Sequence, residues 1–176
     1  MTEFLLDTMV WFRASLLLGA VAVAACWLLA RTHQVPPALT TPSLLHVFYG
    51  CIIGMMGTGH LVAVTIKAAA GHLSPDVSPW FVYPLGAAIA VPGWLLVLSG
   101  AMLPSARAWP RRLLVILDGW LVLLFVPLGP SAALAVPAAL SLLWLFSRKE
   151  GIRRAAVVSS VFVYAAMLFA SAFVTF

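Results

Sequence analysis

The chain is poor in charge and in the residues that build soluble sites. Only 9% of its 176 residues are charged, including five acidic residues, and it has two cysteines. A soluble domain carries about a quarter of its residues as charges, so this composition argues against a soluble enzyme, a nucleic-acid module and a disordered tail. Two cysteines do not make a secreted disulfide scaffold, and we expect both to be packing residues.

Familiar catalytic motifs are also absent. The sequence has no Gly-x-Ser-x-Gly nucleophile motif, no His-Glu-x-x-His zinc motif and no phosphate-binding glycine loop. No cysteine pair has metal-binding spacing, and we predict no metal site. These absences weaken the case for an enzyme without removing it, because a membrane enzyme acting on a lipid can work with one Asp and one His.

What the chain has instead is hydrophobic length. Hydrophobic residues make up 64% of it, and the mean hydropathy is +1.10. Because about 20 apolar residues cross the bilayer core, we predict an all-α, six-helix transmembrane bundle that forms one integral membrane domain over residues 1–176. The expected helices run from Val10 to Ala30, Ser43 to Ile66, Trp80 to Leu103, Leu113 to Phe146 as two short helices, and Ala155 to Phe176.

The stretch from Leu113 to Phe146 is too long for one crossing, and proline and glycine interrupt it at Pro127-Leu128-Gly129-Pro130. Proline removes a helix donor and glycine permits a turn. The sequence therefore predicts a tight hairpin of a short fourth and a short fifth helix.

Positive residues set the expected orientation. The first, third and fifth loops hold eight of the ten Lys and Arg residues, which favours their placement in the cytoplasm. We therefore expect a multi-pass protein of the cell inner (plasma) membrane with both termini outside the cytoplasm. The same positive charge favours anionic membrane lipids as partners, and not nucleic acid. The eight residues are Arg31, Arg107, Arg111, Arg112, Arg148, Lys149, Arg153 and Arg154.

The second predicted helix is unusually rich in glycine. Gly50, Gly54 and Gly57 would let another helix approach closely. This face predicts tight packing, and it is a candidate surface for a partner membrane subunit or a second copy of the chain.

The same helix carries His46 and His60, fourteen residues apart, which places both side chains on one face. Membrane cytochromes of the b type hold haem with histidines at about this spacing, so haem b is an alternative reading. Each iron needs a second axial ligand, yet the third to sixth predicted helices contain no histidine. The only others are His33 and His72, which lie in the flanking loops.

Asp118 lies in the fourth predicted helix, where a charged carboxylate costs about 2.5–3.5 kcal/mol. It enters the bilayer from the cytoplasmic side, as does His46, so the two depths predict a contact between them. The competing partners are Arg107 and Arg112, which would reach back along the helix. The contact would either fix helix packing or serve acid–base chemistry, and Asp118 and His46 are the candidate catalytic residues.

Four further residues are candidates to bind a ligand. His60 and Lys67 continue one face of the second helix toward the outer surface, and Trp94 and Trp120 lie deep in the third and fourth helices. Pro92 precedes Trp94 closely, and a proline break beside a large indole would shape an apolar pocket.

The region from Leu96 to Phe146 resembles small multi-pass bacterial inner-membrane proteins. The matching pieces are Ser99-Gly100, Trp109-Pro110-Arg111-Arg112 and Pro127-Leu128-Gly129. This resemblance implies a bacterial inner membrane and no particular activity.

These observations favour a non-catalytic membrane protein, either an accessory subunit or a binder of a hydrophobic small molecule between its helices. The alternative is an intramembrane enzyme acting on a lipid-like or isoprenoid substrate with Asp118 and His46 as an acid–base pair. A haem b electron carrier is the second alternative.

Overall fold

The computed structural model describes residues 13–25, 28, 41–71, 78–103, 108–127 and 129–173. Within these ranges every regular element is helical and no strand occurs, which confirms the predicted all-α class. A helical segment, Arg13–Ala25, comes first. The labelled elements that follow are α2 (Thr41–Ala69), α3 (Pro79–Met102), α4 (Trp109–Phe125), the 3-10 helix η1 (Gly129–Leu134), α5 (Ala135–Phe146) and α6 (Glu150–Phe173).

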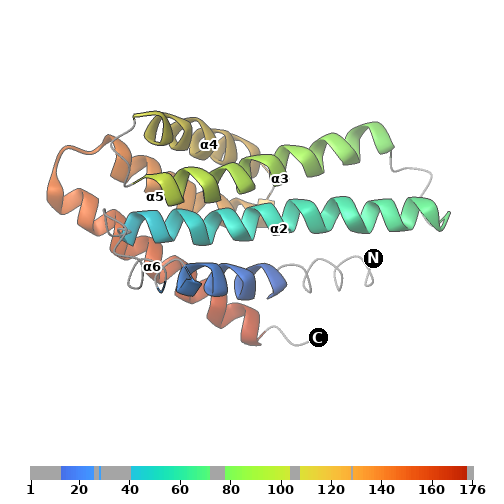
Figure 1. Cartoon of the computed structure of the whole chain (residues 1–176), viewed down its shortest axis with the longest axis horizontal. Coiled ribbons are helices and arrows are strands. Elements are labelled where there is room, and N and C mark those ends of the chain that lie inside the picture. Colours follow the sequence, from blue (N-terminus) through green and yellow to red (C-terminus); the bar gives the residue numbers. More distant parts are fainter. Residues whose placement is uncertain are drawn as a thin grey trace.

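Helices α2 and α3 form a long antiparallel hairpin that runs the length of the molecule (Figure 1). Among the described residues, they are the two helices long and apolar enough to cross a membrane. Their candidate spans are Pro42–Ala69, with 28 residues and a mean hydropathy of 1.6, and Trp80–Met102, with 23 residues and a mean hydropathy of 1.9.

Glycines bring these two helices into backbone contact. A Cβ atom built on Gly50 would lie 2.6 Å from the Val97 nitrogen, and one built on Gly57 would overlap the backbone of Ala90. Gly93 of α3 meets the backbone of Gly54 in the same way. The predicted close packing at the Gly50, Gly54 and Gly57 face is therefore present, and the helix that fills it is α3 of the same chain.

The predicted break in the long apolar stretch is present. Helix α4 ends at Phe125, and η1 begins at Gly129. With 17 residues α4 is about 26 Å long, and with 12 residues α5 is about 18 Å long. Both helices are short, as the proline-glycine turn predicts, and η1 forms the return between them.

Two predicted loops are shorter than expected because their ends are helical. Helix α6 begins at Glu150, although the sequence analysis assigned residues up to Arg154 to a loop. An acidic residue is favourable in the first turn of a helix, and Glu150 also pairs with Arg153 and Arg154, one turn along. Helix α4 likewise begins at Trp109, because Pro110 fits the first turn of a helix.

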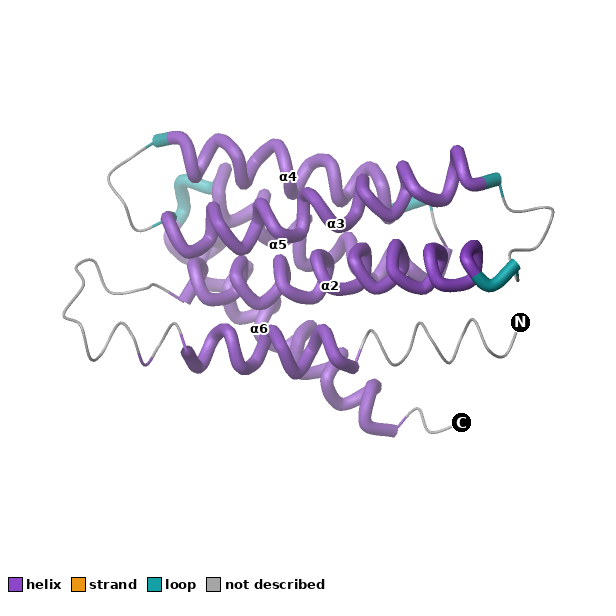
Figure 2. Tube along the Cα trace, turned by 45° about the vertical axis from the view of Figure 1, so that its right-hand side comes forward, coloured by secondary structure: helices purple, strands orange, loops and turns teal. Residues whose placement is uncertain are grey.

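The remaining helices pack around the hairpin. Helix α4 lies against α3 and α5, and α5 lies against α6, while Arg13–Ala25 follows α2 on another side (Figure 2). Gly19 of this N-terminal segment meets the ring of Phe48. Cys51 is buried in α2, and Cys26 lies outside the described residues.

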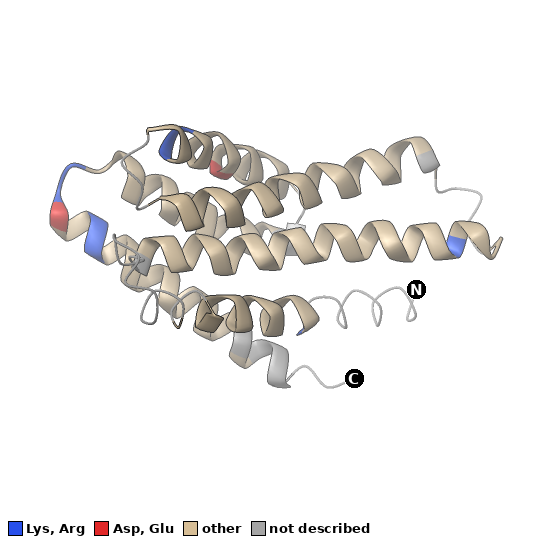
Figure 3. Cartoon of the chain, viewed as in Figure 1, with Lys and Arg blue, Asp and Glu red and all other residues tan. Residues whose placement is uncertain are grey.

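Charged side chains gather at one end of the molecule. The start of α4 and the α5–α6 connection carry most of the described basic residues, and both lie at the end where α2 begins (Figure 3). The described residues of these two segments include six cations and one acidic residue, Glu150. The six cations are Arg111, Arg112, Arg148, Lys149, Arg153 and Arg154.

Candidate functional site

Asp118 is fully buried on the inner face of α4. Leu114 and Leu121 lie four and three residues away on the same face and are buried with it, as is the preceding residue, Leu117. Helical spacing thus forces a carboxyl group into an apolar helix interface. Arg111 holds the start of this helix against the end of α5 by donating a hydrogen bond of 2.7 Å to the Leu145 carbonyl.

His46 lies in the first turns of α2 and faces Asp118. Its Nε2 atom is 3.6 Å from Asp118 Oδ2, so the structure contains the contact that the two depths predicted. The other ring nitrogen, Nδ1, lies 2.6 Å from the Pro42 carbonyl oxygen. Because a carbonyl only accepts, Nδ1 must carry a proton in this arrangement, and the ring is held by its own helix.

Ser141 of α5 bridges the two residues and was not singled out from the sequence. Its Oγ atom lies 2.6 Å from His46 Nε2 and is hydrogen-bonded to Asp118 Oδ2. Residue spacing gave no signal for it, since Ser141 lies five residues before the end of α5 at Phe146 and Asp118 lies nine residues after the start of α4 at Trp109.

Hydrogen-bond directions allow two proton arrangements in this Asp118–Ser141–His46 chain. In one, a protonated Nε2 donates to Ser141, and Ser141 donates to Asp118 Oδ2. In the other, each proton has moved one place, so that Asp118 donates to Ser141 and Ser141 donates to Nε2. Both arrangements leave the three residues with no net charge, so together they store a single proton that can sit at either end.

A pocket lies beside this chain, between α2, α5 and α6. About 330 Å³ of space lies within its outline, and this figure includes space outside the molecule. His46 and Ser141 lie on its wall, and Leu45, Leu140 and Val157 supply apolar surface. The pocket therefore combines an apolar interior with one polar edge, which is the usual composition of a site for a small apolar molecule.

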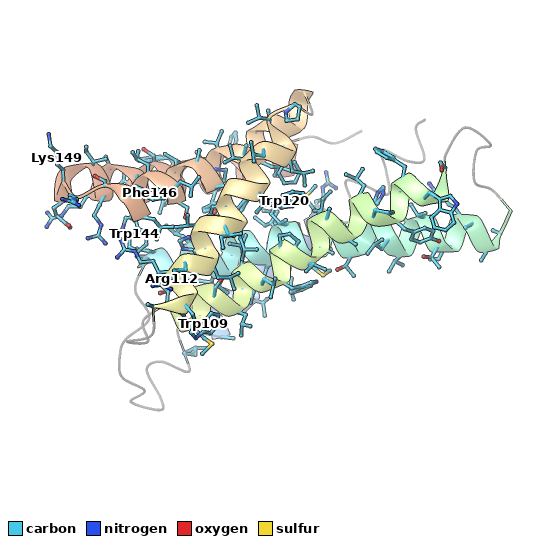
Figure 4. The ribbon with its side chains drawn as sticks, turned by 90° about the horizontal axis from the view of Figure 1, so that it is seen from above. Trp109, Arg112, Trp120, Trp144, Phe146 and Lys149 are labelled. Carbon is cyan, nitrogen blue, oxygen red and sulfur yellow. The ribbon has the colours of Figure 1, made fainter. Side chains whose placement is uncertain are left out.

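Aromatic side chains shape the remaining wall. Trp144 lies 6.3 Å from the His46 ring, between ring centres, and Arg153 lies 4.9 Å above the Trp144 ring. Figure 4 shows Trp144 near Arg112, at the basic end of the molecule. Tyr49 and Tyr164, 6.3 Å apart between ring centres, line the pocket on its deeper side. None of these three aromatic residues was predicted from the sequence to belong to a site.

Trp120 and Trp94 fasten helices together and do not line this pocket. Trp120 Nε1 of α4 donates to the Ala88 carbonyl of α3 at 3.0 Å. That carbonyl lacks its usual helical donor because residue 92 is a proline. Trp94 Nε1 donates to Thr58 Oγ1 of α2 at 3.1 Å, and its ring covers Gly54.

His60 and Lys67 also lie away from the pocket. Lys67 is in the last turn of α2, and its Cα is about 31 Å along the helix from that of His46. His60 packs against Gly86 of α3, and its buried Nε2 atom has no hydrogen-bond partner among the described residues. Of the predicted site residues, the structure brings together Asp118 and His46 and leaves the other four dispersed.

The geometry bears directly on haem ligation. Both ring nitrogens of His46 are engaged, one by Pro42 and the other by Ser141, so neither points freely toward an iron atom in this arrangement. The described residues contain no group of three or more His, Cys, Asp or Glu side chains that would hold a metal ion. His33 and His72 lie outside the described residues.

The candidate site therefore has two parts, which are the proton-sharing Asp118–Ser141–His46 chain and the apolar pocket beside it. Comparison with models of known families, with curated proteins and with solved structures found no match.

Proposed function

We propose that this protein binds a hydrophobic small molecule in the pocket between α2, α5 and α6, as a non-catalytic membrane protein. One observation carries the proposal. The pocket has apolar walls from Leu45, Leu140 and Val157 and a polar edge at His46 and Ser141, so it suits a molecule with a long apolar part and one polar group.

Co-purification tests this proposal. The protein would be extracted from membranes in a mild detergent, and bound small molecules would be measured by mass spectrometry after solvent extraction. Ala156 is buried and lines the pocket, whereas Ala155 is its exposed neighbour. We expect Ala156→Leu to fill the pocket and remove the bound molecule, and Ala155→Leu to retain it. An equal yield of every extracted molecule from both variants would overturn the proposal.

The membrane setting is part of the same proposal. We infer a six-helix bundle in the cell inner membrane, with the basic end in the cytoplasm and both termini outside. The two long apolar helices and the gathering of cations at one end support this orientation. Large apolar side chains such as Leu123 and Phe162, about 70% or more exposed, would contact lipid, and the six cations would contact anionic headgroups.

Reporter fusions test the orientation. Alkaline phosphatase is active only outside the cytoplasm, so we expect high activity when it follows Phe176 and low activity when it follows Ser147. The opposite pattern would overturn the proposed topology. Such a result would leave the pocket proposal intact, because the pocket is defined by contacts within the chain.

A partner membrane subunit, or a second copy of the chain, would need a face other than the predicted glycine face. Gly50, Gly54 and Gly57 are covered by α3. Exposed apolar residues such as Trp80 and Phe81 at the start of α3 remain available for such a contact.

An intramembrane enzyme is the second candidate, and the Asp118–Ser141–His46 chain is the observation that favours it. A proton stored beside an apolar pocket suits acid–base chemistry on a lipid-like or isoprenoid substrate. The test is Asp118→Asn, because an amide still hydrogen-bonds Ser141 but cannot exchange a proton. Loss of substrate turnover in cells with normal protein level is expected of an enzyme, and full activity would rule out this role for Asp118.

A further inference from the structure

The hydrogen-bond donors around the pocket are almost all committed to fixed partners. Tyr49 donates its hydroxyl proton to the Leu134 carbonyl at 2.6 Å, and Ser160 donates to the Ala156 carbonyl at 2.9 Å. His46 Nδ1 is bound to Pro42, and Ser141 is used within the chain to Asp118. None of these groups has a free proton to offer a ligand.

Tyr164 is the exception on the deep side of the pocket. Its side chain is 6% exposed and lines the pocket, yet its hydroxyl donates to no acceptor among the described residues. Its ring is fixed by an edge-to-face contact with Phe48 at 5.0 Å between ring centres. The fully enclosed side-chain atoms without a partner among the described residues are His60 Nε2 and Asp118 Oδ1, and the Tyr164 hydroxyl is not one of them. This hydroxyl therefore keeps some accessible surface, and an acceptor atom of a ligand in the pocket could form a hydrogen bond with it.

Trp144 also lines the pocket. Its indole N–H has no acceptor among the described residues, and its ring is half-buried. The donor that the pocket offers on its deep side is the Tyr164 hydroxyl, and the residues that line the pocket include no carboxylate side chain. A ligand that suits these side chains has an oxygen atom that accepts a hydrogen bond, and it carries no charge.

We propose that the pocket binds a neutral apolar molecule through a carbonyl-type oxygen, such as that of a ketone, ester or quinone, which accepts the hydrogen bond of Tyr164. This inference rests on the proposed function and names its ligand class. Leu45, Leu140 and Val157 would contact the apolar part of the molecule. The carbonyl group would accept a hydrogen bond from the Tyr164 hydroxyl without placing a charge among apolar side chains.

A matched pair of probes tests the inference. The protein would be reconstituted in lipid nanodiscs with the fluorescent apolar dye aminoanthracene, and the dye would be displaced with methyl nonyl ketone or with undecane. After correction for partitioning into lipid, we expect the ketone to bind about fivefold more tightly than the alkane, which is the size of one net hydrogen bond. Tyr164→Phe should bring this ratio to about one, and Tyr83→Phe, on α3 and away from the pocket, should leave it unchanged.

An infrared measurement gives an independent readout on the unaltered chain. The stretch of an isotope-labelled carbonyl in the ketone should move to lower frequency on binding, and this shift should vanish in Tyr164→Phe. Equal affinity for ketone and alkane, or a shift that survives Tyr164→Phe, would overturn the inference alone. Failure of the dye and both probes to bind, or binding that Ala156→Leu leaves intact, would overturn the proposed function as well.

Discussion

Toward α3, helix α2 presents glycines and touches its neighbour backbone to backbone, whereas toward α5 and α6 it presents His46 and Tyr49 and leaves a pocket. The closeness of the first contact comes from missing Cβ atoms. The second is held by hydrogen bonds that join α2 to α5 and η1. Helix α2 thus packs closely against α3 where glycines lack side chains. Toward α5 and α6 its polar side chains form the contact and leave a pocket.

The glycine contact should be the most sensitive to substitution. In Gly57→Ala the new Cβ would meet backbone atoms of Ala90, which cannot move aside. We expect the free energy of unfolding, measured by denaturant titration in detergent micelles, to fall by about 2–3 kcal/mol. Gly119→Ala is the control, because a Cβ there meets nothing within 4 Å, and it should be neutral or stabilising by up to about 1 kcal/mol. Similar losses in both variants would contradict this account.

The polar contact should depend on hydrogen bonding more than on charge. Asp118→Ala removes the acceptor at the end of the chain and should lower the free energy of unfolding by about 2 kcal/mol. Asp118→Asn keeps an amide that can donate to Ser141, so this substitution should lower the free energy of unfolding by less than about 1 kcal/mol. The measurement is the same denaturant titration. If Asp118→Asn lowered the free energy of unfolding as much as Asp118→Ala does, ionisation and not hydrogen bonding would stabilise this interface.

Trp120 allows the comparison to be extended to the α3–α4 contact. Trp120→Phe should cost about 1 kcal/mol in the free energy of unfolding, because the Ala88 carbonyl loses the indole donor that replaces the missing N–H of Pro92. With Pro92→Ala in place, the restored backbone N–H can serve that carbonyl. The cost of Trp120→Phe should then fall by at least about 0.5 kcal/mol in a double-mutant cycle. Strict additivity would argue against the role assigned to Trp120.

The smallest effect is expected at the exposed basic end. Glu150 pairs with Arg153 at 3.8 Å and with Arg154 at 3.2 Å, and all three side chains are exposed or partly exposed. Glu150→Gln should change the free energy of unfolding by no more than about 0.5 kcal/mol, and added salt should shrink the difference. A loss above about 1 kcal/mol would mean that this pair stabilises the start of α6 more than an ordinary surface ion pair does.

Several features of the fold were predictable because they depend on local sequence. Apolar runs predicted the helices, and the Pro127-Leu128-Gly129 turn predicted the break that shortens α4 and α5. Equal depth predicted the contact between Asp118 and His46, which lie 3.6 Å apart between Oδ2 and Nε2. Depth along a helix follows from residue number alone, so such a pairing can be read without knowing how the helices pack.

The rest of the candidate site was not predictable in the same way. Ser141, Tyr49 and Tyr164 are ordinary residues in apolar helices, and nothing in their local sequence marks them as neighbours. Trp94 and Trp120 lie far enough from the ends of their helices to suggest a pocket. Each indole N–H instead donates a hydrogen bond to a neighbouring helix. Which face of a helix meets which neighbour depends on rotation about the helix axis, and depth does not fix that rotation.

By itself the sequence determined that the chain is helical, strongly apolar and basic at one end, because composition and periodicity act residue by residue. Only the tertiary structure decided that α3 covers the glycines, that Ser141 completes the link between Asp118 and His46, and that Tyr164 keeps a free hydroxyl beside a pocket. Those outcomes depend on the packing of helices far apart in sequence, where a rotation of one helix exchanges every neighbour on its surface.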